Sequence, residues 1–161
     1  LKDTMGILQR CRDSRLTIIK KILLQDPKFS LHSIELDEIN RYNLPTDETT
    51  LLSGTIQNRD LLREGLPEFK KAKPDHKKIG LLLSEHHTIL RDVLDVSTPK
   101  IEMMLDAAMD AGALGGKING SGGGGCMFAY VPQNPEKVVE AINKSGGKAY
   151  IIHSDVGTRI D

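Results

Sequence analysis

The chain has 161 residues, the size of one domain, and 39% of them are hydrophobic, as in an ordinary globular protein. Lysine plus arginine and aspartate plus glutamate both number 22, so the formal net charge is +0 and no general basic surface for nucleic acid or acidic membranes is indicated. Aromatic residues make up 4% of the chain, and no tryptophan is present, which argues against an aromatic platform for bases or sugars.

The chain begins with a predicted amphipathic helix over about residues 3–24, and Pro27 follows it as a stop. Residues 29–42 are mixed in character. There we expect a short extended piece over 29–34 and a short helix over 36–42. The residues of the first helix expected to face inward are Ile7, Leu8, Cys11, Ile18, Ile22 and Leu23.

A second helix is predicted after Pro45, where Thr46 or Asp47 can cap the free backbone amides of its first turn. Gly65 and Pro67 are expected to end it, since both disfavour continuation of a helix. Its expected inward face consists of Leu51, Leu52, Thr55, Ile56, Arg59 and Leu62.

Two further helices are predicted between residue 74 and Gly112. One covers about residues 74–94, and the next is capped by Thr98, begins at Pro99 and ends before Gly112. Three methionines of the later helix, Met103, Met104 and Met109, are interpreted as packing residues. The inward faces are expected to be Ile79, Leu82, Leu83, His86, Leu90, Val93 and Leu94, and then Ile101, Met104, Leu105 and Ala108.

The last third alternates strands with a helix. Strands are predicted over 116–119, 126–131 and 148–153, and between the last two lies a helix capped by Asn134 and begun by Pro135. This order predicts an α+β fold in which a small antiparallel sheet carries helices on one face, beside an N-terminal helical region. The helix faces the core with Val138, Val139 and Ile142.

Between the first two strands lies the stretch K-I-N-G-S-G-G-G-G-C, residues 117–126, in which half of the residues are glycine. Ordering a glycine costs more backbone entropy than ordering any other residue, so a fixed run of glycines needs a reason. One reason is close approach of the backbone to a ligand, with successive N–H groups forming a nest for an anion such as phosphate. The alternative is a flexible hairpin connection.

Two common phosphate loops do not fit this stretch. Gly120, Gly122 and Gly125 match the dinucleotide pattern G-x-G-x-x-G, but that pattern must follow a strand and open a helix, and here a strand follows. A P-loop requires a glycine five residues before Gly116-Lys117 and Ser or Thr after the lysine, and both are missing. A glycine-rich bend between two strands remains.

The glycine stretch, read as G-G-K-I-N-G-S-G-G-G-G-C, resembles the third conserved motif of the GHMP small-molecule kinases. The upstream segment S-E-H-H-T-I-L-R-D-V-L-D-V-S-T-P, residues 84–99, resembles the segment that precedes this motif in the galactokinases of that family. Together the two segments cover residues 84–131, and the C-terminal domain of a GHMP kinase, most similar to galactokinase, is the expected identity of residues 1–161.

The resemblance implies an ATP-dependent kinase that transfers the γ-phosphate to a sugar hydroxyl, with Mg²⁺ bridging the phosphates. It places the loop residues Asn119, Gly120, Ser121, Gly122, Gly123, Gly124 and Gly125 at the phosphates, with Lys117 as a further candidate contact. The family's nucleotide loop, catalytic aspartate and Mg²⁺ ligands belong to an N-terminal domain that no stretch here matches. The resemblance therefore implies no catalytic residue and no metal ligand in this chain, and a fragment that is inactive without its N-terminal domain.

Several other residues invite a functional interpretation. His86 and His87 point about 100 degrees apart on a helix and cannot share a metal ion, so His86 is interpreted as partly buried and His87 as a surface residue. Arg91 and Asp92 are expected to cap or pair with neighbouring helices. Lys117 fits a solvated strand position as well as a phosphate contact.

The two cysteines, Cys11 and Cys126, have no C-x-x-C spacing and no paired histidines, so neither a zinc site nor a disulfide framework is expected. Cys126 is interpreted as a small buried residue that closes the glycine loop. With no signal peptide recognised, the expected location is the cytoplasm. Because residue 1 is leucine, we expect a fragment or a processed chain.

Other functions stay open on the sequence alone. Asn119 and Ser121 stand where galactokinases more often carry Thr and Gly, which leaves heptose, fucose and mevalonate-type kinases as alternatives to a galactokinase. A non-catalytic α+β module that binds a small molecule is a second class, and a packing domain is a third. The expected partners are ATP, a small sugar substrate and the chain's own N-terminal domain, with no nucleic acid and no membrane.

Overall fold

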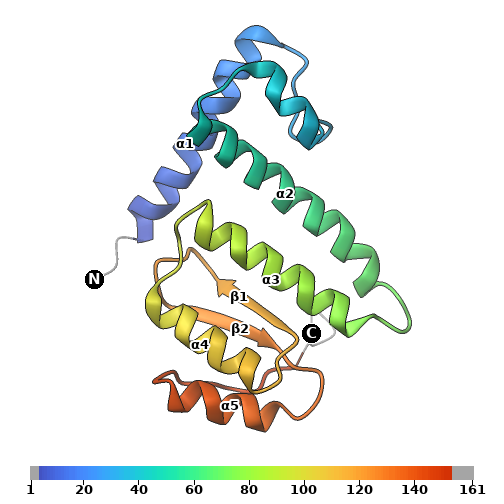
Figure 1. Cartoon of the computed structure of the whole chain (residues 1–161), viewed down its shortest axis with the longest axis vertical. Helices are drawn as coiled ribbons and strands as arrows, with labels where there is room; N and C mark the ends of the chain where they lie inside the picture. The colour runs from blue at the N-terminus through green and yellow to red at the C-terminus, as the bar shows by residue number, and fades with distance from the viewer. Residues whose placement is uncertain (1–3, 154–161) are drawn as a thin grey trace, which may run out of the picture.

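A computed structural model describes residues 4–153 of the chain. Helices and a single two-stranded antiparallel sheet make up this part, and Figure 1 shows their arrangement. The elements in chain order are α1 (Thr4–Gln25), the 3-10 helix η1 (Leu36–Tyr42), α2 (Thr46–Phe69), α3 (His76–Asp92), α4 (Pro99–Asp110), β1 (Gly115–Asn119), β2 (Cys126–Tyr130) and α5 (Pro135–Lys144). The predicted α+β class is confirmed.

Local sequence signals explain three of the helix ends. The Thr98 side chain accepts a hydrogen bond from the Ile101 amide at the start of α4, with Pro99 in the first turn. Gly112 follows α4 with φ 105°, a conformation that glycine adopts without a Cβ clash. At α3, the Asp75 carboxylate accepts from the Lys77 and Lys78 amides. These caps satisfy backbone groups that no helical partner reaches.

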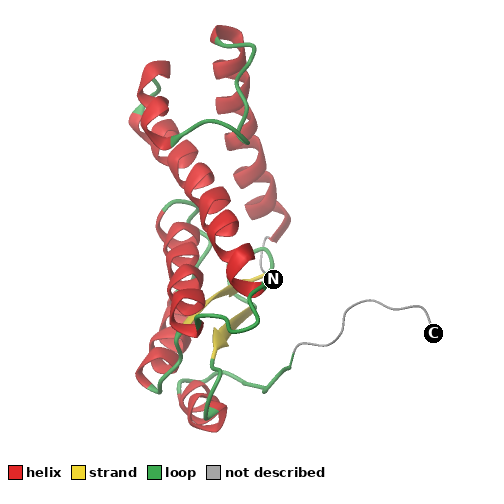
Figure 2. Cartoon of the chain, turned by 90° about the vertical axis from the view of Figure 1, so that its right-hand side faces the viewer, coloured by secondary structure: helices red, strands yellow, loops and turns green. Residues whose placement is uncertain are grey.

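Two hydrophobic clusters hold the described residues together. One joins α1, η1 and α2 and contains Ile18, Ile22, Ile34, Ile39, Tyr42, Leu52 and Ile56. The other lies between the sheet and helices α4 and α5, and contains Val96, Ile101, Met104, Leu105, Ala108, Ala113, Ile118, Val138 and Ile142. Figure 2 shows that the helices of the first cluster extend away from the sheet, which belongs to the second cluster.

Helix α3 lies directly against β1 (Figure 1). A Cβ built on Gly80 would stand 2.1 Å from the Leu114 carbonyl oxygen, and one on Gly115 would stand 1.9 Å from the Gly80 carbonyl oxygen. Both distances are far shorter than any real Cβ contact. Glycine at both positions therefore lets the two backbones touch, and β1 is held between α3 and β2.

In the sheet, β1 and β2 pair with Gly115 opposite Tyr130 and Asn119 opposite Cys126. Ile118 is 1% exposed and belongs to the core cluster, whereas Lys117 is half-buried. The sheet ends in the glycine loop, residues 120–125, as the sequence predicted.

Four predictions about elements are wrong. The N-cap of α2 is Pro45, with no side-chain hydrogen bond, and not Thr46 or Asp47. Helix α2 runs past Gly65 and Pro67 to Phe69. Gly65 is buried against α3, and Pro67 lies within the last turn, where it costs the helix one amide-to-carbonyl hydrogen bond without ending it. Residues 148–153 form no strand, because no described strand lies beside them to share a ladder. Residues 29–34 form turns without an extended strand.

Several side chains predicted to face inward are exposed. They belong to positions at the edge of an apolar stripe, where a small error in helix phase moves a residue from core to surface. These are Leu23, which is 39% exposed, Leu62, which is 61% exposed, and the methionines Met103 and Met109, while Met104 is buried as expected.

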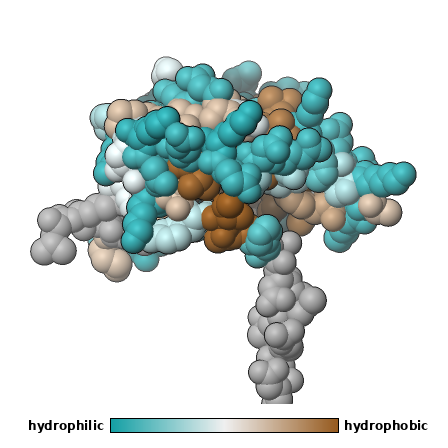
Figure 3. Space-filling view, turned by 90° about the horizontal axis from the view of Figure 1, so that it is seen from below, coloured by the Kyte–Doolittle hydropathy of each residue, from teal (hydrophilic) through white to brown (hydrophobic). Residues whose placement is uncertain are grey.

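Seen from the end at which α5 lies, the surface is mostly hydrophilic with a small hydrophobic area (Figure 3). Exposed large apolar side chains near the end of the described chain are Tyr150, Ile151 and Ile152. Across residues 4–153, none of the helices combines the length and the apolar character that a membrane span requires.

Candidate functional site: the glycine loop and its supports

The connection between β1 and β2 has a backbone that suits glycine alone. Five of its residues have φ between 67° and 109°, the region in which a Cβ meets the neighbouring carbonyl oxygen. A Cβ on Gly120 would meet nothing within 4 Å, so the space beside that residue is open. The five glycines are Gly120, Gly122, Gly123, Gly124 and Gly125.

The loop is anchored to the connection between α3 and α4 (Figure 1). The Gly123 amide donates a hydrogen bond of 2.5 Å to the Val96 carbonyl oxygen, and a Cβ on Gly122 would stand 2.5 Å from the Val96 Cβ. Val96 is itself 5% exposed and part of the core. The Gly123 amide is thus used inside the protein and is not offered to a ligand.

The polar side chains of the loop remain accessible. Asn119 is exposed and Ser121 is partly exposed, and within residues 4–153 neither side chain has a hydrogen-bond partner. These two side chains and the open side of Gly120 are therefore the parts of the loop that a ligand at this end of the sheet would meet.

Lys117 lies below the loop in a half-buried position. Its ammonium donates a hydrogen bond of 2.7 Å to the Ile118 carbonyl oxygen and stands 5.4 Å from the centre of the Phe128 ring. Burial lowers the pKa of Lys117. Lys117 is therefore neither fully solvated nor enclosed, and its ammonium is hydrogen-bonded to the protein's own backbone.

His86 faces Lys117, and His87 faces the core. Burial, followed by the positive charge of Lys117, lowers the pKa of His86 to about 4, so its ring is neutral near pH 7. The prediction that His87 is a surface residue is wrong, because its side chain is 6% exposed. Its ring lies within hydrogen-bond distance of the Ile118 amide and of Glu102.

Glu102, in the first turn of α4, accepts hydrogen bonds from several side chains. Its carboxylate accepts from His87 Nε2 at 2.9 Å, from the Ser97 hydroxyl and from Arg91 at 3.3 Å. Burial acts to raise the pKa of Glu102, but the hydrogen bonds from Ser97, His87 and Arg91 outweigh it and lower the pKa. The carboxylate is therefore ionised. The prediction that Arg91 pairs with a neighbouring helix is confirmed by its contact with Glu102, whereas Asp92 pairs with Arg91 of its own helix.

Cys126 differs from its predicted role. Its side chain is exposed, so the interpretation as a small buried residue is wrong. The cause is the strand's alternation: Met127 shares the face of the buried Ile118 across the sheet, and Cys126 falls on the other face. Among residues 4–153, no three His, Cys, Asp or Glu side chains are placed to hold a metal ion together.

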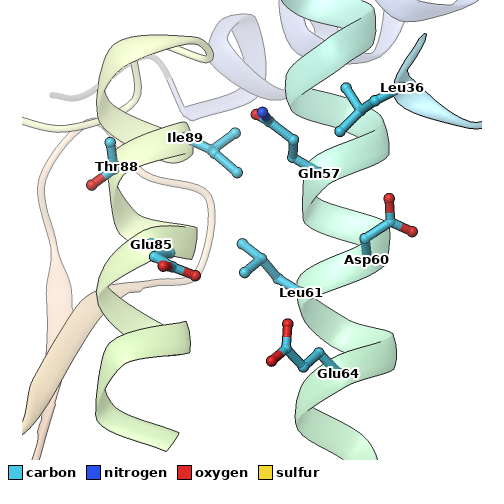
Figure 4. Close-up of a pocket in the computed structure, with 8 residues that line it drawn as sticks. All are labelled: Leu36, Gln57, Asp60, Leu61, Glu64, Glu85, Thr88 and Ile89. Atoms are coloured by element: carbon cyan, nitrogen blue, oxygen red, sulfur yellow. The ribbon is translucent and has the colours of Figure 1, made fainter. Parts of the chain in front are cut away.

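A hollow of about 360 Å³ lies elsewhere, between α2 and α3 (Figure 4). Its acidic side chains are largely paired, Asp60 with Arg59 at 2.7 Å and Glu64 with Lys78 at 2.9 Å. No residue of the glycine loop contributes to it. The lining residues are Leu36, Gln57, Asp60, Leu61, Glu64, Glu85, Thr88 and Ile89.

The sheet, its glycine loop and the helices beside it match a known class of protein domain. The family described as GHMP kinases C terminal matches residues 62–148, more than half of the chain. The chain therefore belongs to the GHMP kinase family, of which it contains the C-terminal domain.

Individual relatives differ in name. Mevalonate kinase from Thermococcus onnurineus is 46% identical over 85 residues, which are 52% of this chain and 25% of that protein. Mevalonate kinase from Pyrococcus furiosus is 45% identical over 75 residues, 47% of this chain and 22% of that protein. Galactokinase from Streptomyces coelicolor is 39% identical over 57 residues, 35% of this chain and 15% of that protein.

Among solved structures, Lactococcus lactis galactokinase complexed with galactose superimposes with a TM-score of 0.76 at 18% identity. The superposition covers 86% of this chain and 37% of that one, and it shows a shared fold. The chain spans about a quarter of the length of the mevalonate kinases that it matches.

The sequence pattern indicates the glycine loop but not the residues that hold it in place. Val96 and Ser97 belong to the segment 84–99 that resembles galactokinases, and Glu102 lies three residues beyond it. The available signal was a carboxylate in the first turn of a helix directly after that segment, near a histidine one turn before the end of the preceding helix.

Proposed function

We propose that this chain is the C-terminal domain of an ATP-dependent kinase that phosphorylates the alcohol group of a small molecule, and that its glycine loop lies at the phosphates. The family membership of residues 62–148 supports the class of reaction. The placement of the loop at the phosphates rests on its backbone. Five of its glycines have positive φ, a conformation that disfavours any side chain.

The chemistry suits such a loop. Phosphoryl transfer requires that the phosphates be positioned and that developing negative charge be met by fixed dipoles, with little covalent work for the protein. The exposed Asn119 side chain and the partly exposed Ser121 side chain offer such dipoles at this end of the sheet. Residues 4–153 contain no cluster of His, Cys, Asp or Glu side chains fit for a metal ion, and in this proposal the Mg²⁺ that accompanies ATP is held by the rest of the kinase.

For the acceptor, the sequence relatives favour mevalonate. The two mevalonate kinases are 46% and 45% identical over 85 and 75 residues, against 39% over 57 residues for a galactokinase. A sugar is the second candidate, supported by the resemblance of residues 84–99 to galactokinases. The structural likeness to galactokinase bears on the fold alone, at 18% identity.

A panel of acceptors tests the proposal. The complete kinase that contains this domain is incubated with MgATP and, in separate reactions, with mevalonate, galactose, fucose and a heptose, and ADP release is followed. We expect turnover with mevalonate and none with the sugars. Turnover with one of the sugars, and none with mevalonate, would show that the acceptor is that sugar. ATP-independent binding of a phosphorylated metabolite, with no turnover of any acceptor, would favour the non-catalytic module.

A further inference from the structure

His87 is a buried polar side chain that the proposed phosphate loop does not itself use. The ring is 6% exposed and touches both of the segments that hold the loop. Its Nδ1 lies 3.4 Å from the Ile118 amide nitrogen, two residues before Gly120, and its Nε2 lies 2.9 Å from Glu102 Oε1.

These two contacts specify one form of the ring. An amide is only a donor, so Nδ1 must be the unprotonated nitrogen that accepts from Ile118. The ionised Glu102 is an acceptor, so Nε2 must carry the proton and donate it. A proton on Nδ1 would face the Ile118 N–H and remove the link to β1.

Through Glu102, the hydrogen bonds of His87 also extend to the segment around Val96, which holds the middle of the loop. Glu102 also accepts from the Ser97 hydroxyl, and Ser97 directly follows Val96. Val96 in turn accepts from the Gly123 amide and packs against Gly122. The strand that enters the loop and the connection that holds its middle are thus tied through a single imidazole and a single carboxylate.

From this arrangement we propose that His87 is a positioning residue for the glycine loop, acting as a neutral imidazole with its proton on Nε2 between Glu102 and the Ile118 amide. It does not touch the nucleotide. The expected effect of His87 on catalysis rests on the proposed function. Its tautomer and its hydrogen-bond partners do not depend on that function.

The tautomer is tested first, on the 161-residue chain with ¹⁵N-labelled histidine. Two-dimensional NMR correlations between ring nitrogens and ring protons near pH 7 distinguish the two tautomers by the chemical shift of each nitrogen. We expect His87 with an unprotonated Nδ1 and a protonated Nε2. A proton on Nδ1, or a doubly protonated ring, would overturn the proposal whether or not the protein is a kinase.

Variants of the complete kinase then separate positioning from packing. His87→Leu replaces the imidazole with an apolar side chain of similar size and removes both hydrogen bonds. His87→Asn keeps an acceptor that can stand near the position of Nδ1. We expect the KM for MgATP to rise roughly ten- to a hundredfold in His87→Leu, because a displaced loop misplaces the phosphates, and to stay close to wild type in His87→Asn.

The acceptor KM provides the internal control, together with thermal unfolding of each variant. A packing role would lower the amount of folded enzyme and leave both KM values unchanged. That pattern, or equal KM values for MgATP in His87→Leu and His87→Asn, would contradict the positioning role while leaving the kinase assignment intact. If the wild-type kinase transferred no phosphate, the proposed function would fail, and the NMR result would still decide the tautomer.

Discussion

At the scale of single residues, Gly122 carries two constraints at once. Its φ of 77° disfavours any side chain, and a Cβ there would also stand 2.5 Å from the Val96 Cβ. Gly120 shares the first constraint, with φ 87°, but has nothing within 4 Å. The two positions therefore separate backbone strain from steric fit.

Alanine at these positions gives a matched pair. Gly120→Ala is expected to reduce the free energy of unfolding of the chain by about 1–2 kcal/mol, the cost of a left-handed residue with a Cβ. Gly122→Ala is expected to cost roughly a further 1–3 kcal/mol, because Val96 must move. Urea unfolding followed by circular dichroism measures both. Equal losses would mean that the loop is not packed on Val96.

His86 makes stability depend on pH. Its pKa is lowered from 6.5 to about 4, so between these values the unfolded chain binds a proton that the folded chain does not. The free energy of unfolding should therefore fall as the pH decreases from about 6.5 towards 4, by roughly 1–2 kcal/mol, because solvent screens the partly exposed ring.

Urea unfolding at pH 7.5 and pH 5 tests this, because the carboxylates with lowered pKa values remain ionised across that interval. The control is His86→Gln, which keeps a polar side chain that cannot titrate. We expect a smaller loss of stability at pH 5 in the variant than in the wild type. The same loss in both proteins would assign the pH dependence to other groups.

At the scale of elements, the contact between α3 and β1 sets the position of the strand that leads into the loop. Gly80 allows it, since a Cβ there would stand 2.1 Å from the Leu114 carbonyl oxygen, a backbone atom that cannot rotate away. Gly65 in α2 is a useful contrast. Its Cβ would stand 3.7 Å from a Leu82 methyl group, an ordinary contact.

Alanine substitution in these two helices should have opposite effects. Gly80→Ala is expected to lower the free energy of unfolding by at least about 2 kcal/mol, because the helix and strand must separate. Gly65→Ala is expected to raise it by about 0.5–1 kcal/mol, the gain in helix propensity. Thermal unfolding of both variants measures the difference. A stabilised Gly80→Ala would show that α3 and β1 are not in backbone contact.

Elements whose signals are local could be predicted from the sequence. The caps at Thr98 and Gly112 and the two strands around the glycines depend on neighbouring residues, and these predictions are confirmed. The strand over 148–153 was wrong, because a strand exists only where a partner lies beside it. The burial of His87 was missed for a related reason: helical spacing gives a stripe, but the position of β1 decides which edge of α3 is covered.

At the scale of the whole molecule, the chain is one part of a larger functional unit in our account. It spans about a quarter of the mevalonate kinases that it matches and 37% of the galactokinase that shares its fold. The glycine loop lies at one end of the sheet, anchored to Val96, with Asn119 and Ser121 unpaired among the described residues. ATP binding and turnover are therefore expected of the complete kinase.

The most direct measurement compares two valine variants of that complete kinase. Gly120→Val fills the open side of the loop, and Gly146→Val is its control, because Gly146 has a similar φ of 84° and also nothing within 4 Å but lies after α5. With rates corrected for the folded fraction, Gly120→Val should lower kcat/KM for MgATP by about a hundredfold, while Gly146→Val stays near wild type. Equal values for the two variants would contradict a glycine loop at the phosphates.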